Sequence, residues 1–139
     1  EIIEAAGEIL KREGFIVKLV KVPKDSSRKE VLSAEKMREF YRGLDFYLCA
    51  SWNEGTPNPV LEAAACGVPA ITTRVGNMRE LINPGVNGFF VEPSVESIVD
   101  GCRNIRGIEP SEYDKMRCAM RETILGNWTW KKNIQNLSM

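Results

Sequence analysis

The 139-residue sequence contains no histidine, so this chain supplies neither a histidine general base nor a histidine metal ligand. It has no Asp-x-Asp motif either, which leaves a divalent metal site of that kind without support. The cysteines form no Cys-x-x-Cys pair, so zinc-ligand spacing is also missing. We therefore expect buried, reduced cysteines in a cytosolic protein. They are Cys49, Cys66, Cys102 and Cys118.

Long apolar runs and an excess of one charge are absent as well. No run approaches the roughly 18 residues of a membrane-spanning helix, and the chain shows no signal-peptide pattern. Nineteen basic residues balance nineteen acidic ones, which removes the electrostatic argument for nucleic acid or an anionic membrane as the main partner. With 43% hydrophobic and 27% charged residues, the composition is that of one ordinary globular domain.

Short apolar runs alternate with segments of helical periodicity along the whole chain. The runs at Phe15–Val22, Phe46–Ala50, Val68–Thr73 and Phe89–Val91 predict buried strands. Strands that alternate with helices favour a parallel sheet covered on both faces. The fold class is therefore predicted as α/β, a single Rossmann-like domain with a doubly wound parallel sheet.

Capping residues predict where several helices begin and end. Gly14 and Gly67 are each expected just past the end of a helix. Ser94 and Ser111 are predicted N-caps, and Asn58 is a third because a proline follows it at the first helical position.

Two glutamates flank the predicted start of the helix after Phe46–Ala50. Glu54 lies on the loop that leaves the strand, and Glu62 lies in the first turns of the helix. A helix N-terminus binds anions such as a diphosphate, and carboxylates beside it can accept hydrogen bonds from sugar hydroxyls. The arrangement suits a nucleotide-sugar. The spacing alone leaves a second interpretation open, in which the glutamates only stabilise the helix dipole.

The stretch from Ser51 to Val91 resembles the retaining glycosyltransferases with two Rossmann-like domains, the GT-B fold. Their family-4 members carry a pattern like S-x-x-E-G-[FT]-P-x-x-x-L-E-A-x-A-x-G-x-P-[VA], which here runs from Ser51 to Ala70. The segments Gly76–Ile82 and Asn87–Phe89 are similar to further motifs of the family. The resemblance implies the C-terminal, donor-binding half of such an enzyme.

For the sugar end of the donor, the resemblance implies contacts from three consecutive residues. Glu54 matches the glutamate that faces the donor sugar and is the expected catalytic residue. Gly55 and Thr56 match positions where the backbone approaches the sugar closely.

For the nucleotide end, the resemblance implies contacts from the start of the next helix. Asn58 and Val60 would donate backbone N–H groups to the diphosphate, and Leu61 would lie beside the ribose. Glu62 matches the glutamate that binds the ribose hydroxyls. Arg74 matches no motif and is interpreted as a solvated loop charge.

The resemblance also implies parts that this chain does not contain. Residues 1–139 are expected to be an N-terminally truncated donor-binding domain, because the family's basic pair precedes a helix inside which this chain begins. The isolated chain should be inactive without the acceptor-binding domain. The full-length enzyme is expected to transfer a hexose with retention and without an essential metal or other cofactor. We expect it in the cytoplasm, with association at the inner face of the membrane left open.

Two other classes remain as alternatives. One is a non-catalytic nucleotide-binding or regulatory α/β module. The other is a receiver-type domain, which needs an acidic cluster and a phosphorylatable aspartate at strand ends; Asp25 and Asp45 do not supply a convincing one.

Overall fold

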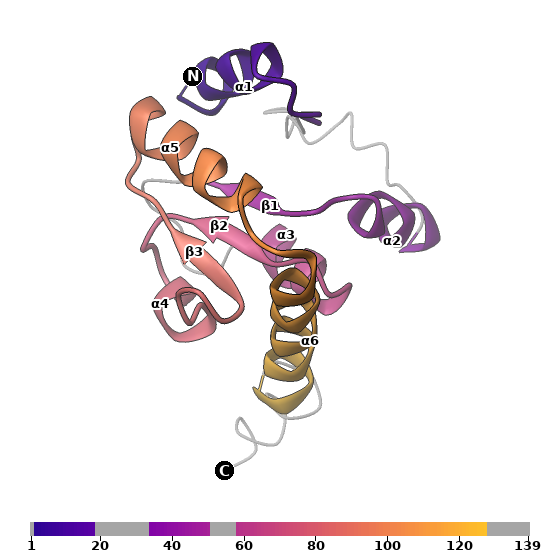
Figure 1. Cartoon of the computed structure of the whole chain (residues 1–139). Helices are drawn as coiled ribbons and strands as arrows, with labels where there is room; N and C mark the ends of the chain where they lie inside the picture. The colour runs from indigo at the N-terminus through magenta and orange to yellow at the C-terminus, as the bar shows by residue number, and fades with distance from the viewer. Residues whose placement is uncertain (1, 19–33, 51–57, 128–139) are drawn as a thin grey trace, which may run out of the picture.

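The computed structural model describes residues 2–18, 34–50 and 58–127. Helices and strands alternate along most of this part of the chain (Figure 1). In chain order the elements are α1 (Ile2–Arg12), α2 (Ala34–Arg42), β1 (Tyr47–Cys49), α3 (Asn58–Ala65), β2 (Ala70–Thr72), α4 (Met78–Leu81), β3 (Gly88–Phe90), α5 (Val95–Arg106) and α6 (Pro110–Asn127).

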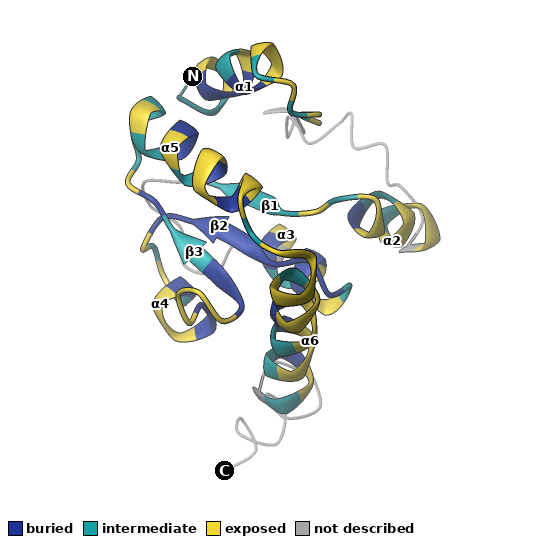
Figure 2. Cartoon of the chain, in the orientation of Figure 1, coloured by how far each residue is buried: buried dark blue, intermediate teal, exposed yellow. Residues whose placement is uncertain are grey.

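The strands of the described residues form one parallel sheet in the order β1-β2-β3. The central strand β2 is buried along its whole length, and Figure 2 shows it dark blue between its neighbours. Burial on both faces explains why this strand is a continuous apolar run in the sequence. The predicted parallel strands at Phe46–Ala50, Val68–Thr73 and Phe89–Val91 are confirmed, with ends that differ by one or two residues.

Helices cover both faces of the sheet and form two separate cores (Figure 1). On one face, α1 and α5 pack around Ile71 of β2. On the other face, α3, α4 and α6 pack around Ala70 of the same strand. Adjacent residues of a strand point to opposite faces, so β2 joins the two cores. A third cluster lies beside α3, where α2 contributes Tyr41.

Three of the predicted helix boundaries are confirmed by their hydrogen bonds. Gly14 and Gly67 have positive φ values of 92° and 77°, and the N–H groups of each glycine and of the residue after it bond back to the preceding helix. Both helices therefore end in the glycine-terminated motif that satisfies their last carbonyl groups. Ser94 caps α5, because its side chain accepts a hydrogen bond from the Ser97 N–H at 3.2 Å.

Other expectations are corrected. Helix α6 begins at Pro110, so Ser111 is not its cap; the Glu109 carbonyl already accepts the first helical hydrogen bond, from the Tyr113 N–H. Proline suits the first helical position, where no N–H is needed. Helix α3 likewise begins at Asn58, so Asn58 is its first residue and not the cap before it.

The expected strand at Phe15–Val22 is not formed in its described part, residues 15–18. Phe15 instead packs against the core of α1 and α5, where the Arg106 guanidinium lies 3.7 Å from the centre of its ring. The four cysteines form no disulfide, but the expectation that all are buried holds only for Cys102: Cys49 and Cys66 are half-buried, and Cys118 is exposed.

The loop from α4 to β3 is held by one buried amide side chain. Asn87 is 2% exposed, and its Oδ1 accepts from the Asn83 N–H at 2.8 Å. Its Nδ2 donates to the Leu81 carbonyl at 2.9 Å and to the Thr123 hydroxyl of α6 at 3.3 Å. Asn87, which directly precedes β3, therefore links this strand to α4 and α6.

Candidate functional site

The candidate site lies at the edge of the sheet where the parallel strands end. Ligands of open α/β sheets bind beyond the carboxyl ends of the strands. Segment 51–57 leaves β1 at this edge and leads into α3, while Arg74 and Glu92 follow the ends of β2 and β3.

The residues predicted to bind the donor sugar fall in that first segment. Glu54, Gly55 and Thr56 lie outside the described residues, so their contacts stay predictions.

The residues predicted to bind the nucleotide all lie at the start of α3. The first N–H groups of a helix have no partner within the helix, and here they belong to Asn58, Val60 and Leu61, since Pro59 has none. The Val60 side chain is fully buried in the core of α3, α4 and α6, so only its backbone can face a ligand. Leu61 is half-buried beside the same core, and Glu62 is exposed.

Glu62 has a partner that the sequence did not indicate. Its Oε2 accepts a hydrogen bond of 2.8 Å from the hydroxyl of Tyr41, a residue of α2 that is 4% exposed. Burial, and then the hydrogen bond and charge of Glu62, raise the pKa of the Tyr41 hydroxyl above its ordinary value of 10. The hydroxyl is therefore a proton donor throughout the physiological range. A buried tyrosine hydroxyl usually finds a hydrogen-bond partner, and here that partner lies on another helix.

Arg74 is more constrained than the solvated charge expected from the sequence. Its Nη1 lies 3.1 Å from Oε1 of Glu92, and its guanidinium lies 4.7 Å from the centre of the Phe90 ring. Both side chains of the ion pair are at least half exposed, so the pair contributes little to stability. The contacts nevertheless link the ends of β2 and β3.

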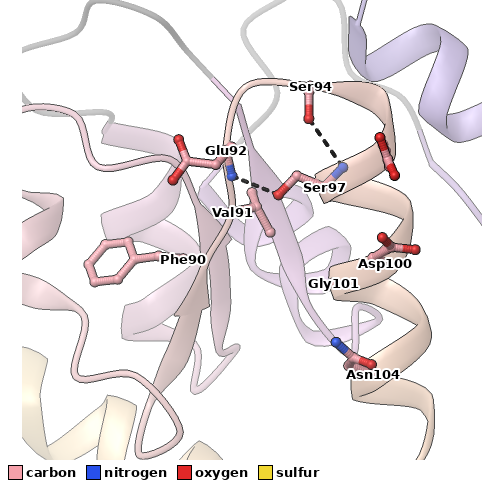
Figure 3. A pocket seen from close by; sticks show the side chains of 9 residues that line it. Phe90, Val91, Glu92, Ser94, Ser97, Asp100, Gly101 and Asn104 are labelled. Atoms are coloured by element: carbon pink, nitrogen blue, oxygen red, sulfur yellow. Dashed lines mark hydrogen bonds between the residues drawn. The ribbon is translucent and has the colours of Figure 1, made fainter.

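An open pocket of about 410 Å³ lies between β3 and α5 (Figure 3). The carboxylates of Glu92, Glu96 and Asp100 line it, together with Ser94 and Ser97, whose hydrogen bonds fix the start of α5. Of the predicted site residues whose side chains the structure describes, Val60, Leu61 and Glu62, none lines this pocket. Its negative charge would repel a diphosphate, so this pocket does not suit an anionic ligand of that kind.

Comparison with known proteins identifies the family of this α/β domain. Residues 4–106 match the family described as glycosyl transferases group 1. The chain belongs to this family. A D-inositol 3-phosphate glycosyltransferase of Geodermatophilus obscurus is 28% identical over 113 residues, which cover 74% of this chain and 22% of that protein. A sucrose synthase of Thermosynechococcus vestitus is 34% identical over 86 residues, or 56% of this chain and 10% of that protein.

Solved structures share the fold of this domain. The C-terminal domain of a glycosyl transferase group 1 family protein from Francisella tularensis superimposes with a TM-score of 0.63 at 25% identity, over 89% of this chain and 60% of that one. The Anabaena protein HepE, solved in complex with UDP and glucose, gives a TM-score of 0.64 at 18% identity, over 73% of this chain and 28% of that one. The predicted Rossmann-like α/β fold of the GT-B type is thereby confirmed.

Two further observations concern only the described part of the chain. No group of three or more cysteine, aspartate or glutamate side chains there is arranged to hold a metal ion. No helix there is both long enough and apolar enough to span a membrane.

Proposed function

We propose that this chain is the donor-binding domain of a family-4-like, retaining glycosyltransferase that transfers a hexose from a nucleoside diphosphate sugar to an acceptor. Membership of the group 1 family supports glycosyl transfer. The Anabaena structure of the same fold holds UDP and glucose, which supports this class of donor. The bond that breaks joins the anomeric carbon to the diphosphate, and the new bond joins that carbon to an acceptor oxygen.

The observation that carries the proposal is the position of Glu62. Its exposed carboxylate lies one turn into α3, the helix whose unpaired N–H groups begin at the carboxyl edge of the sheet. A diphosphate bound at this helix start would gain hydrogen bonds and the positive end of the helix dipole. The ribose attached to it would then lie within reach of Glu62. The hexose on the other side would face Glu54, Gly55 and Thr56.

The proposal requires a second domain. This chain spans 22% and 10% of the two curated relatives described above. In a two-domain enzyme the acceptor binds to the other domain, and the basic pair that neutralises the leaving diphosphate lies before the first helix. We propose that transfer needs both, without an essential metal, in an enzyme that acts in the cytoplasm or at the inner face of its membrane. Turnover by the 139-residue chain alone would contradict this.

Calorimetric titration of two glutamate variants tests the site in the full-length protein. A thermal-shift panel of UDP-, GDP- and ADP-glucose first selects the nucleotide, since a ligand that binds only the folded state raises the melting temperature. Glu62→Ala should weaken both the free nucleotide and its sugar conjugate by about ten- to a hundredfold, because a hydrogen bond to a charged group contributes about 1.5–3 kcal/mol. Glu54→Ala should weaken only the sugar conjugate.

Glu39→Ala is the matched control, because Glu39 is an exposed glutamate in the second turn of α2. It should change neither affinity. Equal losses for both ligands in both variants would mean that the glutamates have no separate roles. If Glu54→Ala and Glu62→Ala bound both ligands as tightly as Glu39→Ala does, the two glutamates would only stabilise the helix dipole.

A further inference from the structure

The hydrogen bond between Tyr41 and Glu62 joins a rigid group to an exposed one. The Tyr41 ring lies in the cluster with Ala63 and Val68. It makes edge-to-face contacts with Phe40 and Tyr47, with ring centres 5.5 and 5.9 Å away. Packing of this kind restricts the rotamers of the buried ring, so it holds the hydroxyl in place.

An exposed glutamate without such a partner samples several rotamers. In this chain one carboxylate oxygen, Oε2, is held at 2.8 Å by the fixed hydroxyl. An ionised carboxylate has about four acceptor positions, and Tyr41 occupies one of them. The bond from Tyr41 therefore restricts the orientation of a carboxylate that has acceptor positions beyond this one for a ligand.

We propose that Tyr41 is a positioning residue, which orients the Glu62 carboxylate so that it accepts hydrogen bonds from the two neighbouring ribose hydroxyls of the donor. This inference rests on the proposed function, since it takes Glu62 as the ribose ligand. Orienting the carboxylate before binding removes part of the entropy that the complex would otherwise lose. Tyr41 itself does not touch the nucleotide. It acts from α2, 21 residues earlier in the sequence, through the packing of α2 against α3.

The test is a double-mutant cycle on nucleotide affinity in the full-length protein, with UDP, GDP and ADP as probes. Tyr41→Phe keeps the ring and its packing but removes the donor. We expect it to weaken the nucleotide that binds by about three- to tenfold, the equivalent of one net hydrogen bond. In a Glu62→Ala background the same change should have no effect on affinity, because the residue through which Tyr41 acts is gone.

The 2′,3′-dideoxy form of the same nucleotide supplies a second readout that a general packing defect would not give. It lacks both ribose hydroxyls, so its affinity should be equal in the wild type and in Tyr41→Phe. The matched control is Tyr113→Phe. Tyr113 also donates a hydrogen bond from its hydroxyl, at 2.7 Å, but to the Asp45 carbonyl and not to Glu62. This control should leave the affinity for every nucleotide unchanged.

The outcomes separate this inference from the proposed function. A loss in Tyr41→Phe that persists in the Glu62→Ala background, or that extends to the dideoxy nucleotide, overturns the positioning role. If Glu62→Ala weakens binding while Tyr41→Phe does not, the positioning role fails and the ribose contact stands. If Glu62→Ala binds nucleotide as tightly as the wild type, the proposed site itself is wrong.

Discussion

Replacing Asn87 should destabilise the domain more than replacing Asn83, the other asparagine in the loop between α4 and β3. Its amide is 2% exposed and makes three hydrogen bonds, to Asn83, Leu81 and Thr123. A net hydrogen bond contributes about 0.5–1.5 kcal/mol, and a buried group left without its partner costs more. The bond to Thr123 is long, at 3.3 Å, and water can reach the exposed residue Asn83. We therefore expect Asn87→Ala to lower the free energy of unfolding by about 2–3 kcal/mol.

Urea denaturation followed by circular dichroism measures this loss, with an unchanged slope against denaturant if the native state stays compact. Asn83→Ala is the control, because its side chain is exposed only four residues away; it should stay within about 0.5 kcal/mol of the wild type. If Asn87→Ala were no less stable than Asn83→Ala, the buried amide would not hold β3 to α4 and α6.

Asn87→Asp probes the direction of the hydrogen bonds. At neutral pH the carboxylate still accepts from the Asn83 N–H but cannot donate to the Leu81 carbonyl 2.9 Å away. Burial and that carbonyl both favour the protonated form, so folding raises the pKa of the new carboxyl. The deficit relative to the wild type should shrink as the pH falls through the folded-state pKa, because the protonated group regains a donor. A deficit that does not depend on pH would refute this assignment.

Two further predictions concern packing and charge. Gly88→Ala should lower the free energy of unfolding by about 1–3 kcal/mol, because a Cβ there would lie 2.4 Å from the Ala70 carbonyl oxygen of the neighbouring strand. Urea denaturation measures the effect. If Gly88→Ala were as stable as the wild type, the register of β2 and β3 would be wrong. The hydrogen bonds from Arg103 lower the pKa of the Glu13 carboxyl below its ordinary 4.5, so this pair stabilises the fold above that pH and the stabilisation is lost as the pH falls through the lowered value. In the wild type the urea concentration at the unfolding midpoint should fall as the pH drops below 4.5, and Glu13→Gln should make this fall shallower. If the fall is as steep in Glu13→Gln as in the wild type, other carboxyl groups cause it.

Local features of the sequence were sufficient to predict most of the sheet. The runs at Phe46–Ala50 and Val68–Thr73 are apolar because both faces of each strand are covered, and that leaves a signal within a few residues. The residues Gly14, Gly67 and Ser94 act on backbone groups three or four positions away, so their roles are also visible in the sequence. The error at Ser111 was local too, because the proline before it suited the first helical position better.

By itself, the sequence determined the α/β class, the parallel strands and, through the motif that runs from Ser51 to Ala70, the family. These depend on short-range periodicity, capping and the order of residue types. Only the tertiary structure decided that Tyr41 meets Glu62, that Asn87 reaches α6, and that Phe15 stacks with Arg106 instead of extending a strand. Each of these contacts joins residues at least 21 positions apart. Periodicity shows which face of a helix is apolar, but the partner and the crossing of two helices follow from how all the side chains fill the shared core.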